Sequence, residues 1–529
     1  MSQAEVYLKS NVVAEPLVDR WYAWSHAISP ATAAMNIVGR HLAIMESYVR
    51  NPQVHTAAVK NAKMRGGPFI DYPRPRVAEV KDLIARTKRD RAQMISFAED
   101  IKKLDDMLRK EAVGYSLQPL YEKIPEGLRG YVELTYDLNN HPSFRVIEPL
   151  LYRSPLYEPS SQSMMLSLID GDERPFILST PRIQDEGDVH LEIPFADRGI
   201  DELFEMKKSP RSLGYIKERL GVNGDGELFE SFFTTREPPK YNNYEGEGMR
   251  WRYFGHACIL LEARGVSILL DPILSYTYEN DVSRYTYEDL PDRIDYVLIT
   301  HNHQDHILFE TMLQIRHKIG TVVVPRSSGG SLQDPSLKHL LEKLGFDDVR
   351  ELEELDSIEI EGGEITGLPF FGEHGDLDIR SKLAYFVRLH DHTLMFAADS
   401  CNIEPVLYEK VHQLVGDVEV LFVGMECDGA PMSWVYGPLL TRSLDRKMDQ
   451  SRRLAGSNFE RAGNIVRCFN CKEVYVYAMG QEPWLDYITS IKYTPESNPI
   501  VASEALLEEC KNKGLVAERL FGEKSILLG

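Results

Sequence analysis

The segment that most restricts the fold of this chain is a cluster of histidines and one aspartate after an apolar stretch. Residues 294–299 have the character of a buried strand, and His301, His303, Asp305 and His306 follow directly, in the pattern His-Asn-His-Gln-Asp-His. Because side chains alternate along an extended backbone, His301 and His303 lie on one side and can reach one cation. Asp305 and His306 follow closely enough to hold a second cation. The segment therefore predicts a two-metal site at a strand end.

Such a site also needs ligands from distant strand ends, and three residues are candidates. Asp399 closes an apolar stretch and is well placed to bridge both ions. Glu373 and His374 follow another apolar stretch and compete for one ligand position. Asp271 ends a short strand-like stretch, where it either orients a ligand imidazole or simply begins a turn.

A linker rich in Pro, Gly and Asn at 237–248 divides the chain. At 529 residues the chain is too long for one ordinary core, so two domains are expected, at 1–245 and 246–529. The first is predicted to be α+β, with helices at 29–50 and 76–111 and strands at 130–138, 164–169 and 189–194. The apolar stripe of the second helix predicts packing inside the chain, with self-association as the alternative.

The second domain alternates short strands with helical stretches, a pattern that predicts an α/β fold of sheets covered by helices. Helices are expected at 336–344 and 458–466. Strands are expected at 251–254, 259–261, 267–270, 294–299, 321–324, 383–389, 393–397, 418–423 and 474–477.

Charge and composition argue against several classes of protein. The net charge of −21 disfavours nucleic acid as the main partner, because phosphate binding relies on Lys and Arg. The N-terminus lacks a secretory signal pattern and no long apolar segment is present, so we expect a cytoplasmic protein without membrane contact. The six cysteines are scattered, and the one CxxC, formed by Cys468 and Cys471, lacks the second ligand pair of a zinc knuckle.

The HxHxDH pattern after a strand, a ligand near residue 373 and an aspartate at a strand end resemble the metallo-β-lactamase superfamily. The resemblance implies an αββα sandwich, two sheets between helices, over roughly residues 249–529. Two departures stand out. In the hydrolases of that superfamily a final histidine after a late strand completes the second metal site, but the last histidine here is His412. Where those hydrolases place a third histidine for the first metal, this chain offers Glu373 beside His374.

These departures favour iron over zinc. Zinc has no redox chemistry, whereas carboxylate-rich N/O ligation suits iron or manganese, and the missing histidine leaves a coordination face open for O2. Together the features resemble the di-iron β-hydroxylases of nonribosomal peptide biosynthesis, of the chloramphenicol-pathway type. By that resemblance Glu373, and not His374, is the ligand.

The same resemblance implies a complete ligand set and an activity. His301, His303 and Glu373 would bind one iron, Asp305 and His306 the other, and Asp399 would bridge them. The protein would be a non-haem di-iron monooxygenase with two iron ions and O2 as cosubstrate. It would hydroxylate the β-carbon of an amino acid held as a thioester on the carrier domain of a nonribosomal peptide synthetase, in antibiotic biosynthesis.

Four other classes of protein are weighed against this interpretation. A dinuclear zinc hydrolase is the main alternative, but it must account for a missing ligand and an acidic replacement. A flavo-di-iron reductase would need a flavodoxin-like module, which is not evident. A ferritin-like bundle needs paired ExxH motifs, and only Glu409 and His412 fit. The intact HxHxDH disfavours a non-enzymatic binding module.

Partners follow from what the chain lacks. Di-iron oxygenation uses two electrons per turnover, yet neither a dinucleotide fingerprint nor a cysteine set for an iron–sulfur cluster is found, so an external reductase or ferredoxin is expected. Residues 1–245 are expected to build a homodimer and to help present the carrier. Because carrier domains are commonly acidic, docking would need a local Lys/Arg patch near the active-site mouth.

Overall fold

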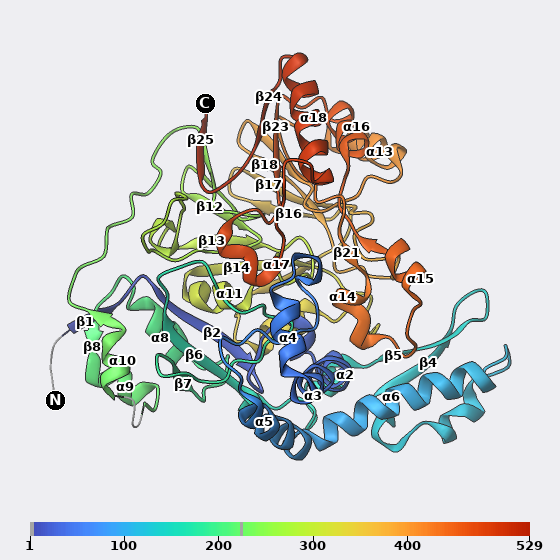
Figure 1. Cartoon of the computed structure of the whole chain (residues 1–529). Coiled ribbons are helices and arrows are strands. Elements are labelled where there is room, and N and C mark those ends of the chain that lie inside the picture. Colours follow the sequence, from blue (N-terminus) through green and yellow to red (C-terminus); the bar gives the residue numbers. More distant parts are fainter. Residues whose placement is uncertain (1–4, 223–225) are drawn as a thin grey trace.

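The computed structural model describes residues 5–222 and 226–529. The N-terminal half of the chain occupies the lower part of the view in Figure 1, and the C-terminal half forms the layered upper part. The first four residues of the N-terminus, which carries no signal pattern, lie outside the described residues. In the part of the chain that is described, no helix has the length and apolar character needed to span a membrane.

The C-terminal half contains two seven-stranded sheets, and all the strands predicted there are found, with small shifts at their ends. The first sheet has the spatial order β15 (Val349–Leu352), β14 (Ile319–Pro325), β13 (Ile294–Leu298), β12 (Val266–Leu270), β11 (Ile259–Ala263), β10 (Met249–Tyr253) and β25 (Lys524–Leu528). The second has the order β16 (Ser357–Ile360), β17 (Gly363–Leu368), β18 (Ala384–Leu389), β19 (His392–Phe396), β20 (Val420–Gly424), β23 (Glu473–Tyr477) and β24 (Val516–Arg519).

Each sheet is parallel on one side, and this pairing brings several carboxyl strand ends to a common edge. The run β12 to β15 is parallel, as is the run β19, β20, β23 and β24. In sheets of this kind ligands bind beyond the carboxyl ends of the strands. Asp271 follows β12, the histidine motif follows β13, and Asp399 follows β19. The topology therefore gathers at one edge residues that are far apart in sequence.

Aromatic side chains fill the space between the sheets, and helices cover their outer faces. Trp251 of β10 stands edge-on to Phe422 and Tyr475 of the other sheet, with ring centroids 5.1 and 4.7 Å away. On the outer face of the second sheet lie α13 (Pro405–Val415), α16 (Phe459–Cys468) and α18 (Asn498–Asn512), at the upper right of Figure 1. α11 (Phe309–Ile315) and α12 (Leu337–Lys343) pack with the first sheet. The predicted αββα architecture is confirmed.

The N-terminal half is α+β, as predicted. Its strands form a four-stranded sheet, a three-stranded sheet and a hairpin: β3 (Trp21–Tyr22), β2 (Val12–Val18), β6 (Gln162–Leu168) and β7 (Val189–Leu191); β8 (Arg211–Ser212), β1 (Glu5–Leu8) and β9 (Phe233–Thr234); β4 (Val132–Tyr136) and β5 (Pro142–Val146). The helix predicted at 29–50 is found as α2 (Pro30–Asn36), a π-helical turn at Ile37–Leu42, and α3 (Ala43–Arg50).

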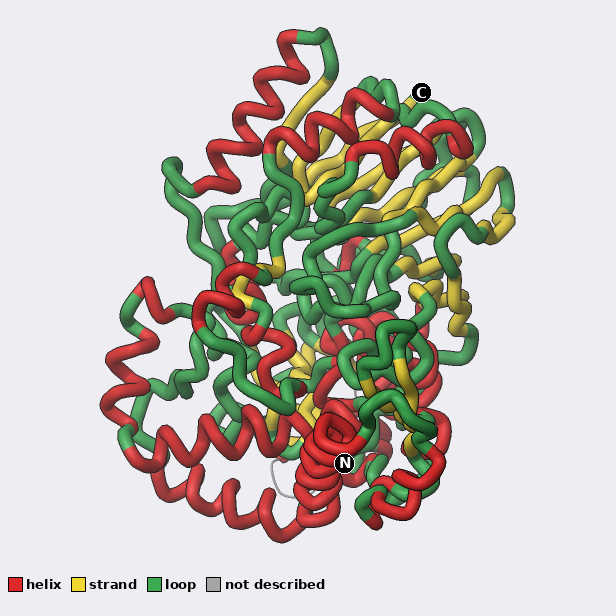
Figure 2. Tube along the Cα trace, turned by 90° about the vertical axis from the view of Figure 1, so that its right-hand side faces the viewer, coloured by secondary structure: helices red, strands yellow, loops and turns green. Residues whose placement is uncertain are grey.

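The long helix predicted at 76–111 is split at Arg91 into α5 (Val77–Asp90) and α6 (Ala92–Glu111), labelled along the lower edge of Figure 1. Figure 2 shows that helices make up much of this lower part of the molecule. Arg91 leaves helical geometry with φ −111° and turns its guanidinium to Asp19, 2.8 Å away. The apolar stripe, which includes Val80, Ile101 and Leu104, is buried in the chain's own core. Packing inside the chain is therefore the correct interpretation of the stripe.

One hydrophobic core is shared by both halves of the chain. The same cluster contains Trp21 and Phe97 of the N-terminal half and Phe309 and Leu313 of α11. The N-terminal half thus covers the outer face of the first sheet. The predicted boundary between 245 and 246 falls in the segment between β9 and β10.

The remaining α-helices and strands are short. They are α1 (Ser25–Ile28), α4 (Pro52–Val59), α7 (Glu148–Leu151), α8 (Gly199–Glu205), α9 (Leu213–Arg219), α10 (Gly226–Ser231), α14 (Ser433–Tyr436), α15 (Arg446–Ser451), α17 (Asp486–Thr489), β21 (Ala430–Pro431) and β22 (Arg453–Leu454).

Candidate metal centre

The predicted motif leaves β13 in a loop whose imidazoles converge. The ring centroids of His301 and His306 lie 4.0 Å apart, and those of His301 and His303 lie 4.8 Å apart. All three rings are buried. Tyr436 of α14 holds the outer nitrogen of one of them, because its hydroxyl lies 2.9 Å from Nε2 of His303. This leaves Nδ1 of His303 to face the centre.

Glu373 and His374, which compete for one ligand position in the sequence, are placed differently. Oε1 of Glu373 lies 2.9 Å from Nδ1 of His303, and Oε2 lies 3.7 Å from Nε2 of His301. The ring of His374 instead stacks on that of His303, and its Nδ1 is 3.2 Å from the carbonyl oxygen of Gly372. Among the described residues, His374 belongs to no cluster of potential ligands, whereas Glu373 does. The geometry favours Glu373.

Three adjoining clusters contain all six predicted ligands. His301, His303 and Glu373 form one; a second joins His301 and His306 to Asp399; a third joins His306 to Asp305 and a further histidine, His256. Within each cluster the ligand atoms lie within 4.8 Å of one another. Because His301 and His306 are each shared by two clusters, the clusters are neighbours, as a pair of metal ions requires.

Unpaired polar atoms show that these residues fit a metal pair. Nε2 of His301, Nε2 of His306, Oε2 of Glu373 and Oδ1 of Asp399 are buried and accept or donate no hydrogen bond within the described chain. Buried polar atoms are normally hydrogen-bonded, so four such atoms in one place call for another partner. Nitrogen and carboxylate oxygen donors of this kind suit iron.

The predicted role of Asp271, as an acceptor that orients an imidazole, is confirmed, and the imidazole is that of His306. Oδ2 of Asp271 lies 2.7 Å from Nδ1 of His306, and Asp271 also accepts from the Thr300 amide at 2.7 Å and hydroxyl at 2.6 Å. Because Nδ1 of His306 carries the proton in this bond, Nε2 keeps its lone pair for a cation. Asp271 also fixes the residue at which the motif loop begins.

We expect Asp271→Asn to weaken iron binding by about 10- to 100-fold, the usual cost of losing such an outer partner. The amide can donate to Nδ1 of His306 and so favour the wrong tautomer. Chelator competition measures the affinity. Asp295→Asn is a matched control, because that carboxylate holds Ser267 of the same sheet at 2.9 Å and contacts none of the ligands. Equal iron retention by both variants would refute this role of Asp271.

The sequence analysis missed His256, which follows β10. Nδ1 of His256 accepts from the Gly480 amide at 3.2 Å, so the ring carries its proton on Nε2, 3.3 Å from Oδ2 of Asp305. Gly480 lies in the loop after the late strand β23, where the hydrolases have their final histidine. His256 therefore contacts a predicted ligand from a neighbouring strand end. The sequence offered one signal for His256, which is its position directly after Gly255 at the end of β10, the first strand of the second domain.

Several residues around the site adopt left-handed backbone conformations that are unusual for side chains other than glycine. The φ angles are 51° at His256, 38° at Asp271, 64° at Glu373 and 45° at Ala398, next to Asp399. Each such residue costs on the order of 1 kcal/mol and persists where the surroundings hold it. The concentration of strain here is typical of a functional site.

Burial and neighbouring charges set the protonation of the site. Burial raises the pKa of Glu373 to about 7, although His303 opposes this. Burial and the adjacent imidazoles hold the pKa of His301 well below its usual value, so that ring is neutral near pH 7. Neutral imidazoles and carboxylates are the forms that bind metals. A bound cation would offset the burial penalty on Glu373.

A cavity of about 620 Å³ opens onto the site. His303, Asp305, Glu373 and Asp399 lie on its wall. The N-terminal half also contributes to the wall, with residues that the sequence analysis did not single out. They are Lys63, Met64, Arg65, Gly66, Gly67 and Phe69.

The fold and the clustered ligands define a metal-binding protein of the metallo-β-lactamase superfamily. A model of the β-lactamase superfamily domain matches residues 267–434, and a model of the N-terminal domain of diiron non-heme β-hydroxylases matches residues 7–238. A UPF0173 protein of Pyrococcus abyssi is 32% identical over 24% of this chain and 50% of its own length.

Two findings cover the chain from end to end. The 4-amino-L-phenylalanyl-(CmlP-peptidyl-carrier-protein) 3-hydroxylase of Streptomyces venezuelae is 39% identical over 98% of this chain and 99% of its own. The crystal structure of CmlA, a diiron β-hydroxylase from the same species, matches with a TM-score of 0.93 and 38% identity over 100% of both chains. This chain belongs to the diiron non-heme β-hydroxylases, which sets the zinc-hydrolase alternative aside.

Proposed function

We propose that this protein hydroxylates the β-carbon of an amino acid held as a thioester on the carrier domain of a nonribosomal peptide synthetase. The S. venezuelae relative is a 3-hydroxylase of an aminoacyl carrier protein, which supports the substrate class. The observation that carries the proposal is the donor set of three imidazoles and three carboxylates, with Glu373 beside His301 and His303. We assign those three residues to one iron, Asp305 and His306 to the other, and Asp399 to both.

Two iron ions bound there would supply the reduction of O2 that converts the C–H bond to C–OH, with two electrons and two protons balancing the second oxygen as water. Other residues of the chain orient the ligand side chains. Asp271 and Tyr436 hold the outer nitrogens of His306 and His303, and His256 contacts Asp305. Beyond β23, Gly480 presents an amide instead of an imidazole. With no imidazole there, the bound irons would keep a position open to substrate and O2.

The cavity wall suits an amino-acid side chain. Phe69, Trp434, Leu454 and Ile491 give it an apolar surface. Trp434 is fixed, because its indole N–H donates to the Gly66 carbonyl at 2.7 Å. Residues of the N-terminal half therefore help to shape the space that an acyl group would occupy.

The mouth of the cavity carries the local basic patch that docking of an acidic carrier requires. Lys63, Arg65 and Arg453 line it, although the whole chain has a net charge of −21. Arg65 is paired with Asp486, and the guanidinium of Arg453 donates to the carbonyl oxygens of Asp428 and Gly429, whereas Lys63 forms no ion pair with any described residue. We infer that Lys63 faces the phosphopantetheine phosphate and the acidic surface of the carrier.

We expect Lys63→Glu to lower kcat/KM for the loaded carrier by about 5- to 10-fold, and more at low salt, because a rim charge acts on association. Steady-state kinetics at two ionic strengths measures this. Lys410→Glu on α13 is the charge-matched control, at an exposed position away from the cavity lining. Equal kinetics of the two variants would rule out docking at this mouth.

We also propose a homodimer. Val113 and Tyr115 after α6 and Leu138 at the tip of the β4–β5 hairpin stay exposed. Tyr136 joins these two segments, since its hydroxyl donates to the Tyr115 carbonyl at 3.0 Å. Grouped exposed apolar side chains of this kind support self-association. A monomer in sedimentation at micromolar concentration would contradict it.

Turnover tests the proposed function directly. Iron-loaded protein, a reductase with ferredoxin, O2 and a panel of aminoacyl-loaded carriers should give a product heavier by one oxygen atom, derived from 18O2. Omitting the electron carrier should stop turnover, and sustained turnover with NADH alone would refute the external donor. Two zinc ions per chain together with esterase activity would refute the oxygenase itself.

A further inference from the structure

The cavity over the metal centre contains one carboxylate that the ligand set does not use. Its wall includes Asp305, Glu373 and Asp399, which are assigned to metal, and also Glu426. Glu426 belongs to none of the clusters of potential ligands in the described chain. The assigned ligand set therefore leaves its carboxyl group available for another role.

Glu426 lies next to the metal centre because of the sheet topology. β20 runs parallel to β19, with Phe422 opposite Phe396, and the Gly424 amide donates to the Ala398 carbonyl at 2.8 Å. Asp399 and Glu426 therefore leave neighbouring strands at the same edge. Asp399 is close enough to contribute to the electrostatics of Glu426.

The side chain of Glu426 has no cationic partner. Oε2 accepts from the Gly429 amide at 2.5 Å, which closes a short turn. No lysine, arginine or histidine of the described chain forms an ion pair with it. Burial raises the pKa of Glu426 to about 7, although the backbone amides oppose this. A half-buried carboxylate without a cation is unfavourable, so a cationic ligand in the cavity would be stabilised there.

The substrate chemistry supplies a cation at this distance. The β-carbon that is hydroxylated must face the metal centre, and the α-carbon one bond away carries a free ammonium when the amino acid is held through its carboxyl group. Whatever group recognises that ammonium must therefore lie beside the metal centre. Glu426 is the carboxylate of the cavity wall that meets this condition without being assigned to metal.

We propose that Glu426 binds the α-ammonium of the tethered amino acid and thereby selects aminoacyl carriers over carriers loaded with an acyl group that lacks the amine. This inference rests on the proposed function. It places the substrate with its amine toward β20 and its side chain against the apolar wall.

Glu426→Gln removes the charge but keeps the oxygen that accepts from Gly429, so the turn is preserved. The matched control is Asp428→Asn, which removes the same charge two residues away. Asp428 is exposed, is held by the Asn498 side chain at 2.9 Å, and does not line the cavity. Glu426→Asp keeps the charge on a shorter side chain.

Two measurements use the iron-loaded full chain. The first is kcat/KM for a carrier loaded with an amino acid and for one loaded with the same acid lacking its amine. We expect Glu426→Gln to lower the first by at least about 30-fold, the smaller cost of removing one partner of a buried charge pair, and to leave the second within about threefold. Asp428→Asn should change neither, and Glu426→Asp should recover part of the loss.

The second measurement is the affinity of the resting protein, without reductant, for the two loaded carriers. The wild type should prefer the aminoacyl carrier, and Glu426→Gln should lose that preference. Equal losses on both carriers, or an unchanged preference, would overturn the assignment to the ammonium. A binding preference that depends on Glu426 without any turnover would keep this inference and refute the proposed oxygenase.

Discussion

Replacing Glu373 by histidine is expected to lower β-hydroxylation by at least about 100-fold and to shift the bound metal from iron toward zinc. The substitution removes one negative charge and exchanges a hard oxygen donor for a nitrogen beside His301 and His303, giving a site more like that of a zinc hydrolase. Loss of a metal ligand should lower activity at least as much as loss of a residue that only orients a ligand, which lowers it by up to about 100-fold. Metal analysis of protein from iron-supplemented cells, together with turnover of a loaded carrier, measures both effects.

His374→Asn is the control for that variant. His374 is adjacent in sequence and equally buried, but it stacks on His303 and belongs to none of the described ligand clusters. It should retain iron and most of its activity. If His374→Asn lost the metal while Glu373→His still hydroxylated, the assignment of the third ligand would be reversed.

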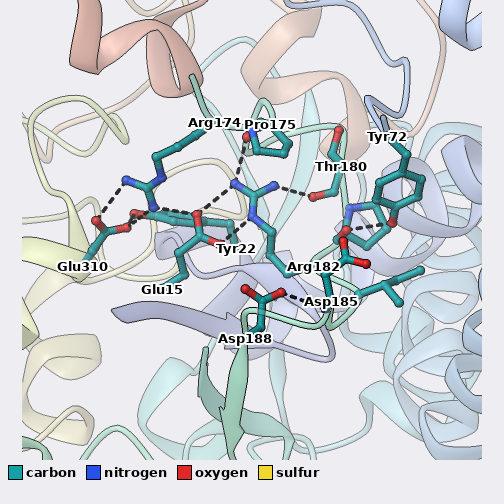
Figure 3. Close-up of polar contacts among 12 residues, drawn as sticks. Glu15, Tyr22, Tyr72, Arg174, Pro175, Thr180, Arg182, Asp185, Asp188 and Glu310 are labelled. Atoms are coloured by element: carbon teal, nitrogen blue, oxygen red, sulfur yellow. Dashed lines mark hydrogen bonds and ion pairs between the residues drawn. The ribbon is translucent and has the colours of Figure 1, made fainter. Parts of the chain in front are cut away.

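Arg174→Met is expected to destabilise the protein by about 3–5 kcal/mol, the usual cost of breaking a buried ion pair from one side. Arg174 lies 2.5 Å from Glu15 and 2.6 Å from Glu310, and Arg182 lies 2.6 Å from Glu15. Figure 3 shows these four side chains facing one another. Glu310 lies in α11, directly after the metal loop. The substitution would leave two buried carboxylates with one guanidinium.

Urea unfolding of the variant and of two comparison variants tests this network. Arg145→Met breaks an exposed pair with Glu133 and should cost no more than about 1 kcal/mol. Adding Glu310→Gln to Arg174→Met should cost less than the sum of the two single changes, because the residues are coupled. Strict additivity would show that Arg174 acts through packing alone.

The same network predicts a dependence on pH. Burial raises the pKa of Glu15, but Arg182 and Arg174 more than offset this and lower it to about 2. A carboxyl group whose pKa is lower in the folded protein stabilises the folded state at a pH above its unfolded-state pKa. It loses that contribution as the pH falls toward its folded-state pKa. The difference in unfolding free energy between wild type and Arg174→Met should therefore shrink as the pH falls from about 4.5 toward 2.

The sequence by itself determined the elements of the sandwich and the four residues of the metal loop. The strands after residue 249 carry short apolar runs bounded by turns, and the loop ligands lie within six residues, so their mutual placement depends mainly on local backbone geometry. Asp399 could be predicted for the same reason, since it closes an apolar strand. The acidic residue Glu373, which stands where the hydrolases have a histidine, could be recognised because the other residues of the superfamily's metal-binding pattern are present.

Only the tertiary structure decided the rest. The contact of Glu373 with His303, while the neighbouring His374 stacks on His303 without joining a ligand cluster, depends on a left-handed backbone at Glu373 that long-range packing maintains. Glu426 and Lys63 carry no local signature, and His256 carries only that of a histidine after a strand end, because each reaches the cavity from a different part of the chain. Pairing between β19 and β20, and packing of the N-terminal half against the first sheet, bring these segments together. Contacts between residues hundreds of positions apart depend on the burial and strand pairing of the whole fold, which no short stretch of sequence encodes.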